Sequence, residues 1–202
     1  AEVAGQLESI GLKVAEIEKL MTAALDREWP TAHQALQVRR VENQTELHAF
    51  AEIVASLWTP ANPLVRGYFE KTSAEVLRAD HPSELYVGYN DGRPVCTTLV
   101  HYAAGVAGVY NVATLADERR KGFARTVVAH ALRAAREHGE RDVILQASAV
   151  GSALYQSMGL RTIGEYREYS IAWASSIQAP AGSLTPSQKN SALNPGQQVE
   201  KI

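Results

Sequence analysis

The residue types best suited to chemistry stand together in one short stretch, Asp117-Glu118-Arg119-Arg120-Lys121-Gly122. An apolar run ending at Thr114 precedes it, and an amphipathic run beginning at Phe123 follows it. In a strand, loop and helix of this order, the first N–H groups of the helix have no partner inside the helix, and the helix dipole favours negative charge beside them. Together with Arg125, the stretch predicts a phosphate or pyrophosphate site. The plainer alternative is a solvated basic loop before a surface helix.

Other classes of function find little support in the composition. The chain has 202 residues with 20 Lys and Arg against 22 Asp and Glu, so no bulk positive field favours nucleic acid. No apolar run approaches the roughly 18 residues that span a bilayer. The single cysteine, Cys96, cannot form an intramolecular disulfide and has too few soft ligands near it for a zinc site. We therefore expect no nucleic acid, no membrane, no metal and a cytoplasmic location.

Two better-known phosphate-binding motifs are also absent. The basic stretch lacks the Gly-Lys-Ser/Thr ending of a Walker loop, and the chain has no G-x-G-x-x-G fingerprint. If the stretch binds phosphate, it does so by another pattern.

The periodicity of apolar residues predicts the elements that position this stretch. Strands are expected over residues 35–41, 84–89, 94–102, 107–114 and 142–145, with one or two more in 160–173. Helices are expected over 45–57, with Thr45 as N-cap, and over 63–79, 123–139 and 151–158. An Asp-Gly turn at Asn90–Arg93 predicts a hairpin. The order of elements predicts an α/β or α+β fold, with a mixed central sheet of about six to seven strands flanked by helices.

Both ends of the chain differ from this middle part. Residues 5–29 carry apolar side chains at three- and four-residue steps, which predicts an amphipathic helix, although an edge strand at Leu12–Ile17 is the alternative. After Ser175 the chain is rich in Ser, Gln, Asn, Pro and Gly, which predicts disorder. The predicted organisation is an amino-terminal helical extension over 1–33, a domain over 34–174 and a disordered tail over 175–202.

Two motifs in this order resemble a known family. Arg119-x-x-Gly122-x-Ala124 resembles the R/Q-x-x-G-x-G/A signature of the GNAT family of N-acetyltransferases, which binds the pyrophosphate of acetyl-coenzyme A there. Leu154-Tyr-Gln-Ser-Met-Gly-Leu160 is similar to the closing element of that family. The resemblance covers roughly Leu36 to Trp173 and implies the GNAT fold.

The resemblance also implies roles for individual residues. The strand residues that would pair with the pantetheine arm are Val112, Ala113 and Thr114. The residues that would surround the pyrophosphate are Arg119, Arg120, Lys121, Gly122, Phe123, Ala124, Arg125 and Thr126. Ser148 stands where many members carry an asparagine that bonds the pantetheine or adenosine arm. Tyr155 matches the tyrosine that acts as general acid to the departing thiolate.

The implied activity is transfer of an acetyl group from acetyl-coenzyme A to an amine of a small molecule or peptide. The amine would attack the thioester directly, through a tetrahedral intermediate, and no metal is required. Many members place a Glu or a water relay on the strands that match 107–114 and 143–145, and neither strand has an acidic residue here. Glu70, His101, Tyr110 and Asn111 are candidates, and the sequence assigns none of them.

Three alternatives therefore stay open. The first is a module that binds acyl-coenzyme A without turnover. Transfer to a hydroxyl or a thiol is the second, and a longer acyl donor is the third. A second copy of the chain is a further candidate partner.

Overall fold

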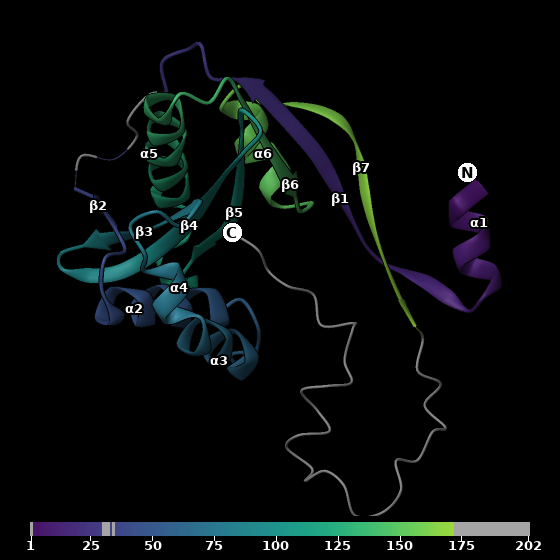
Figure 1. The fold of residues 1–202 in the computed structure, drawn as a ribbon, viewed down its shortest axis with the longest axis horizontal. Coiled ribbons are helices and arrows are strands. Elements are labelled where there is room, and N and C mark those ends of the chain that lie inside the picture. Colours follow the sequence, from purple (N-terminus) through teal and green to yellow (C-terminus); the bar gives the residue numbers. More distant parts are fainter. Residues whose placement is uncertain (1, 30–32, 34, 172–202) are drawn as a thin grey trace, which may run out of the picture. The chain divides into compact units, whose positions relative to one another are not determined.

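The computed structural model describes residues 2–29, 33 and 35–171 (Figure 1). Its helices are α1 Glu2–Ser9, α2 Gln44–Ala55, α3 Pro63–Lys71, α4 Ser73–Val76, α5 Phe123–His138 and α6 Gly151–Ser157, with a 3-10 turn at Ala116–Glu118. Its strands are β1 Leu12–Ala24, β2 Gln37–Arg40, β3 Ser83–Asn90, β4 Arg93–Ala103, β5 Val106–Thr114, β6 Asp142–Ala147 and β7 Arg161–Ile171. The strands form one seven-stranded sheet in the order β2-β3-β4-β5-β6-β1-β7. The predicted mixed sheet flanked by helices is confirmed.

The described residues fall into two compact units. The smaller combines residues 2–18 with 165–171, and the larger is formed by residues 19–164. The smaller unit contains α1 and the outer ends of β1 and β7, where the apolar side chains of Val14, Ile17 and Tyr166 are exposed. All of the residues with predicted roles lie in the larger unit.

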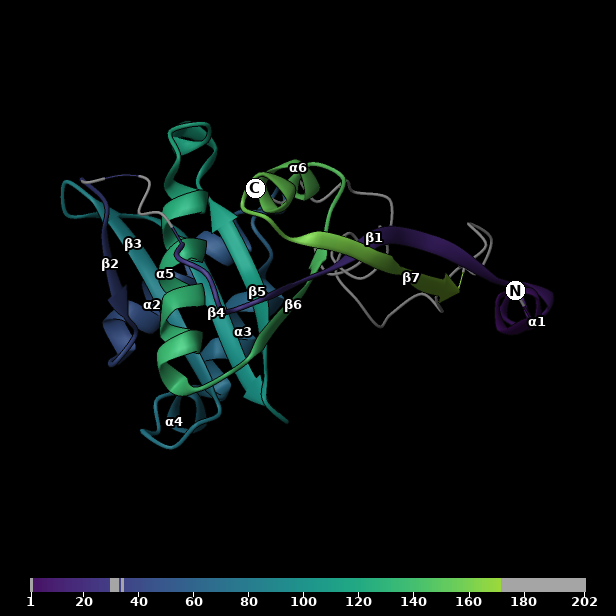
Figure 2. The same ribbon diagram turned by 90° about the horizontal axis from the view of Figure 1, so that it is seen from above.

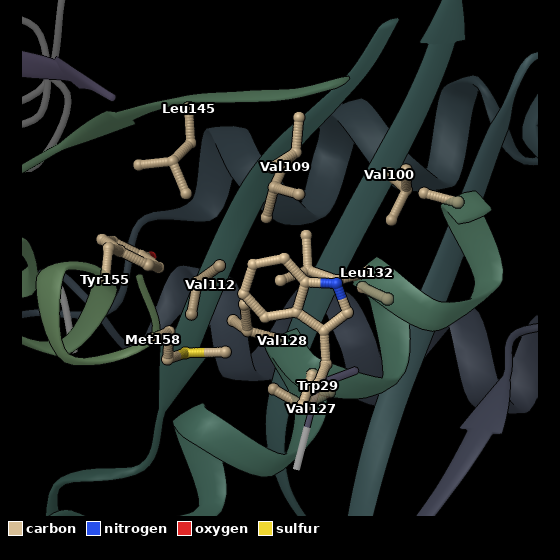
Figure 3. Packing of buried hydrophobic residues seen from close by; sticks show 14 of the residues in the cluster. Trp29, Val100, Val109, Val112, Val127, Val128, Leu132, Leu145, Tyr155 and Met158 are labelled. Carbon is tan, nitrogen blue, oxygen red and sulfur yellow. The ribbon is translucent and has the colours of Figure 1, made fainter. Parts of the chain in front are cut away.

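Helices cover both faces of the sheet in the larger unit. Figure 2 shows α5 on one face of β3, β4 and β5 and α2 on the other. Val127, Val128 and Leu132 of α5 are fully buried in one apolar cluster with side chains of β4, β5 and β6 (Figure 3). A second cluster joins α2 and α3 to alternate residues of β3, among them Leu85 and Val87. The sheet therefore has two separate cores, one on each face.

The helix predicted over residues 5–29 is wrong beyond Ser9, where a strand replaces it. The alternative of an edge strand at Leu12–Ile17 is right in type, but β1 is longer and lies between β6 and β7. Helix α1 ends at Ser9, Gly11 adopts a φ of 88°, and β1 begins at Leu12. Met21, Ala23 and Leu25 are buried on one face of the extended chain, and residues 19–24 pair antiparallel with β6. The apolar spacing suited either period, and pairing with a distant strand decided between them.

Smaller differences concern the ends of elements. The side chain of Asn43, rather than Thr45, caps α2 by accepting from the Glu46 N–H at 3.0 Å. The predicted helix over 63–79 is divided at Thr72 into α3 and α4. The predicted hairpin is confirmed, with Asp91 and Gly92 both at positive φ. The predicted tail over 175–202 lies outside the described residues, and the boundaries at residues 33 and 174 stay predictions.

Candidate functional site

Strands β5 and β6 separate after a short parallel pairing, and this opens a gap in the sheet. They pair only at Val106↔Asp142, Ala107↔Val143 and Gly108↔Ile144. Beyond this point β5 keeps its pairing with β4 on its other side, as far as Thr114. In the second half of β5, the side of the strand that faces β6 therefore lacks a partner strand among the described residues, and its backbone groups are available to a ligand.

An irregularity in β5 lies beside this gap. Asn111 has a φ of 50°, and the pairing register with β4 shifts between Thr97 and Leu99. The Thr97 hydroxyl donates to the Asn111 carbonyl at 2.8 Å, which holds the bulge in place. A bulge redirects the backbone groups of a strand, and it does so here where the two strands diverge.

The loop after β5 leads directly to the N-terminus of α5. Gly122 is the N-cap residue with a φ of 85°, and none of the described side chains caps this end. The Thr126 N–H and hydroxyl both bond to the Gly122 carbonyl, at 3.1 Å each. A Cβ atom at Gly122 would meet nothing within 4 Å. The first N–H groups of α5 thus point into open space with the positive end of the helix dipole.

A hollow of about 760 Å³ lies at this helix end, and we call it the loop pocket. Its lining residues are Thr114, Ala116, Asp117, Glu118, Arg119, Arg120, Gly122, Phe123, Ala124, Arg125, Val150 and Leu154. The pocket joins the end of β5, the basic loop, the start of α5 and one side of α6. The two motifs recognised in the sequence therefore meet at one place in space.

Two acidic side chains neutralise part of the charge of the loop. The carboxylate of Glu118 is buried and binds Lys121 Nζ at 2.8 Å and Arg93 at 3.2 Å. Arg93 also donates to Asp117 at 2.7 Å, and this hydrogen bond holds the pKa of the Asp117 carboxyl below its ordinary value. Lys121 is thereby drawn to Glu118 and is not among the residues that line the pocket.

Three arginines line the pocket. Arg119 Nε donates to the Thr114 carbonyl at 3.2 Å, Arg120 is exposed on a backbone with a φ of 62°, and Arg125 donates to the Ser157 hydroxyl of α6. Three guanidinium groups around an unobstructed helix N-terminus suit a ligand with several negative charges, such as a pyrophosphate. The residues present therefore fit the phosphates of a coenzyme.

Tyr155 of α6 lies at the gap between β5 and β6. Figure 3 shows its ring on the α5 side of the sheet, between Val112 and Leu145, and its exposed fraction is 4%. The helix that carries it is fixed by Ser148, whose hydroxyl accepts from the Gly151 N–H at 3.1 Å. A phenol is thus held in an apolar setting beside the unpaired half of β5.

The predicted site residues divide into three groups in the structure. The pocket is lined by Thr114, Arg119, Arg120, Gly122, Phe123, Ala124 and Arg125. Val112, Ala113 and Tyr155 are buried at the gap, and Thr126 is buried in the first turn of α5. Lys121 is bound to Glu118, and Ser148 is bound to the start of α6.

Sequence reasoning missed several residues of the pocket. Asp117 and Glu118 were part of the stretch, but their pairing with Arg93 of the hairpin joins distant parts of the chain and leaves no local signal. Leu154 precedes Tyr155 in the second motif, so its place in the lining was within reach of the sequence.

Two other side chains, Glu70 and Cys96, lie away from the loop pocket. Glu70 lines a separate hollow of about 310 Å³ between α2 and α3, together with His48 and Arg66. Burial raises the pKa of the Cys96 thiol to about 12, so this side chain is a neutral core residue and a poor nucleophile.

Two features typical of other classes of protein are absent from the ranges that the structure describes. No three His, Cys, Asp or Glu side chains come together there as metal ligands would. Among the helices of the same ranges, none combines the length and the apolar character that crossing a bilayer requires.

Comparison with known proteins agrees with this geometry. The model of the acetyltransferase (GNAT) family matches residues 21–160, which is more than half of the chain. No curated protein matches the sequence.

Solved structures with a similar fold carry related names. A GCN5-related N-acetyltransferase from Kribbella flavida is similar with a TM-score of 0.65 and 19% identity, over 85% of this chain and 64% of its own. A GCN5-related N-acetyltransferase from Sphaerobacter thermophilus has a TM-score of 0.64 and 20% identity, over 83% of this chain and 55% of its own. A predicted acetyltransferase from Clostridium acetobutylicum, solved with acetyl-CoA, has a TM-score of 0.50 and 14% identity, over 63% of this chain and 91% of its own. The chain thus spans less than two thirds of the length of the first two proteins.

Proposed function

Because the chain belongs to the GNAT family of acetyltransferases, we propose that it transfers an acetyl group from acetyl-coenzyme A to an amine of a small molecule or a peptide. One observation carries the proposal: the loop pocket, with its three arginines and open helix N-terminus, adjoins the helix that carries Tyr155 at the gap in the sheet. A phosphate site and a proton donor are therefore close together, at a strand edge that can pair with an extended ligand.

The proposed donor site has a charged end and a strand end. Arg119, Arg120 and Arg125 would hold the pyrophosphate together with the first N–H groups of α5, while Gly122 and Ala124 leave room for it. Backbone groups of Val112–Thr114 would bind the pantetheine arm as an added strand. Phe123 and Thr126 support this helix end from the core, and Lys121 and Ser148 would contribute from its edges.

At the gap, the acetyl group would pass directly from the thioester to the acceptor amine. The thioester supplies an activated acetyl group, which the amine attacks through a tetrahedral intermediate. A backbone N–H near Val112–Thr114 would stabilise the oxyanion. Tyr155 would donate its phenolic proton to the departing sulfur, which is a poor leaving group as a bare thiolate.

The first test is a calorimetric titration of acetyl-coenzyme A into the purified protein, with ATP and desulfo-coenzyme A in separate runs. We expect micromolar binding that requires the coenzyme, because ATP offers phosphates without a pantetheine arm. Arg120→Gln should weaken binding, since it removes a cation from the pocket. Arg161→Gln, a change at an exposed arginine of β7, is the matched control and should bind as the wild type does. Absence of heat for the coenzyme would overturn the proposal.

The alternative of a binding module without turnover has one supporting observation. None of residues 109–114 or 143–147, which border the gap, is Asp or Glu. A module of this kind would bind acetyl-coenzyme A in the titration but would release no free thiol in the presence of amines. Transfer to a hydroxyl or a thiol, or use of a longer acyl donor, would appear in the same assay with other acceptors and donors.

A cytoplasmic location and a homodimer complete the proposal. The location is supported by the one cysteine of the chain, Cys96, which is buried and free. Fractionation of cells and the molar mass of the purified protein in solution test these two points.

A further inference from the structure

Five residues from five neighbouring strands form a row across the face of the sheet opposite α5. The row consists of Ser83 of β3, His101 of β4, Gly108 of β5, Ile144 of β6 and Thr22 of β1, each directly opposite the next. The chain neighbours of the three central residues belong to the core under α5, and side chains alternate along a strand. The row therefore faces away from α5. We call the part around Gly108 and Ile144 the open face.

Tyr110 adds its side chain to this row. It lies two positions after Gly108 and so shares its face. A Cβ atom built on Gly108 would lie 2.7 Å from the Tyr110 hydroxyl oxygen and 2.6 Å from its ring. The ring thus folds back over Gly108, and its hydroxyl occupies the place in the row that the glycine leaves empty. Tyr110 remains accessible to a ligand there, because 39% of the residue is exposed.

His101 is held in place from its other side. Its Nδ1 lies 2.9 Å from the hydroxyl oxygen of Ser83, a residue that is 9% exposed. The Ser83 N–H in turn donates to His81 Nδ1 at 3.1 Å. One nitrogen of the His101 ring therefore has a fixed partner, and Nε2 is the nitrogen left for other chemistry.

The register brings His101 and Tyr110 within reach of each other. Opposite residues on paired strands have Cβ atoms about 4.5–5.5 Å apart. With the Tyr110 hydroxyl beside the Cβ position of Gly108, that hydroxyl lies at most about 8 Å from the His101 Cβ atom. An imidazole ring, with at most one bridging water, closes this span.

We propose that Tyr110, His101 and Ser83 form a proton relay that deprotonates the acceptor amine on the open face. This inference rests on the proposed function. The Tyr110 hydroxyl takes a proton from the ammonium group of the acceptor as it gives its own proton to His101 Nε2. Tyr110 touches the acceptor, while His101 acts through it, and Ser83 positions the imidazole by accepting from Nδ1–H.

The protons and bonds balance over the whole transfer. The freed electron pair of the amine forms the new C–N bond, the C–S bond breaks, and Tyr155 protonates the departing sulfur. The second proton of the amine returns through water to the Tyr155 oxygen. The His101 imidazolium releases the first proton to solvent, so one proton leaves for each acetyl group transferred. Acid and base would then act from opposite faces of the same gap.

The first test reads the His101 ring directly. In the full-length protein labelled with ¹⁵N-histidine, NMR at alkaline pH should show the neutral ring with its proton on Nδ1, because the relay needs Nε2 as an acceptor. Ser83→Ala should abolish this preference. A proton on Nε2 in an enzyme that is active would overturn the relay and leave the proposed function standing.

The second test compares two nucleophiles at saturating acetyl-coenzyme A. At neutral pH, 2-phenylethylamine carries an extra proton and needs a base, whereas hydroxylamine does not. We expect Tyr110→Phe and His101→Gln each to lower kcat/KM for phenylethylamine by about 100-fold, and to leave hydroxylamine unchanged. The double variant should be no slower than either single variant, because the two residues act as one unit.

The outcomes separate a relay from a structural role. His48→Gln, at an exposed histidine of α2, is the matched control and should change neither rate. Equal slowing of both nucleophiles, or effects that multiply in the double variant, would overturn the relay. A wild-type protein that binds acetyl-coenzyme A but acetylates neither probe would overturn the proposed transfer and the relay together.

Discussion

The face of the sheet under α5 and the face opposite it are built from the same strands but are closed to different degrees. Under α5 the side chains of Val109, Val143 and Leu145 are all buried. On the other face α2 and α3 cover β3 and β4, yet Tyr110 and Ile144 remain 39% and 42% exposed. The closed face adjoins the loop pocket and Tyr155. The open face, around Gly108 and Ile144, lies next to His101 and Tyr110.

This difference suggests that one face binds the acetyl donor and the other binds the acceptor. A donor with a long arm and a diphosphate needs fixed partners, and the closed face offers a helix end and a strand edge held by a packed core. An acceptor must enter and its product must leave at every turnover, which an uncovered face permits. We therefore expect substitutions under α5 to change donor binding or the acid step, and substitutions on the open face to change only the use of the acceptor.

The largest effect should come from Gly122→Leu. The substitution strains a backbone at positive φ by about 1–2 kcal/mol and places a side chain where the phosphates would lie. Calorimetry should detect no binding of acetyl-coenzyme A. Gly139→Leu is the matched control, since this glycine ends the same helix with a φ of 100° and equal space around it. The Gly139→Leu variant should lose a similar amount of stability but keep its affinity for acetyl-coenzyme A. Equal loss of binding in both variants would show that strain alone is responsible.

Tyr155→Phe should have the next largest effect. The ring remains in its apolar site, but the proton donor is lost, so kcat should fall by about 100-fold while the affinity for acetyl-coenzyme A stays the same. Steady-state kinetics and the calorimetric titration measure the two quantities. Tyr68→Phe, at an exposed tyrosine of α3, serves as the control. Unchanged turnover in Tyr155→Phe would remove Tyr155 from the role of general acid.

A smaller effect, confined to the acceptor, is expected from Ile144→Asp. The substitution puts a charge into the row of the open face, so KM for an apolar amine such as phenylethylamine should rise by about 10-fold. The dissociation constant of acetyl-coenzyme A should not change. Ile163→Asp, at an isoleucine of β7 that is 55% exposed, is the control. A loss of donor affinity in Ile144→Asp would contradict the division between the faces.

The smallest effect should appear at Glu84, a residue of β3 on the α5 face that has no role in either proposed reaction step. Burial raises the pKa of this carboxyl, but hydrogen bonds from Tyr102 and Tyr86 and the charge of Arg40 outweigh burial, so the pKa lies below its ordinary value. A depressed pKa in the folded state contributes stability above the ordinary pKa of a glutamate, and this stability is lost as the pH falls through the lower value.

Thermal unfolding as a function of pH measures this contribution. In the wild-type protein the melting temperature should decline as the pH falls below about 4.5, with Glu84 as one cause. Glu84→Gln should melt lower than the wild type at neutral pH and should lose less between neutral and acid pH. If the melting temperatures of the two proteins fell by the same amount between neutral and acid pH, Glu84 would not contribute to the pH dependence of stability.

The sequence predicted the closed face better than the open one, for a physical reason. The end of β5, the basic loop and the whole of α5 follow from local signals, namely an apolar run, a run of cations and two glycines that begin and end the helix. The gap between β5 and β6 depends on pairing of residues more than 30 positions apart in the chain. The gap therefore has no signature within a few residues of the sequence.

Two further differences concern Lys121 and β1. The sequence places Lys121 among the cations that would surround the pyrophosphate. In the structure the turn at Ala116–Glu118 brings Glu118 close to Lys121, and the two form an ion pair. β1 looked like a helix because its apolar residues fit both periods until β6 became its partner. Candidate residues for the base were named without a choice among them, since only the register of four strands shows which of them lie together.

The position of β1 has a consequence for how the protein is made. Thr22 of β1 donates to the carbonyl of Val143, a residue 121 positions later in the chain. On the ribosome β1 emerges well before β6, the strand with which it pairs. Its apolar residues therefore stay exposed while all of α2 to α5 is synthesised. Because contacts between distant residues form slowly, the unpaired edge of β1 is exposed to other chains throughout this time. We therefore expect slower translation to lower the soluble yield, and early chaperone binding to this strand to restore it.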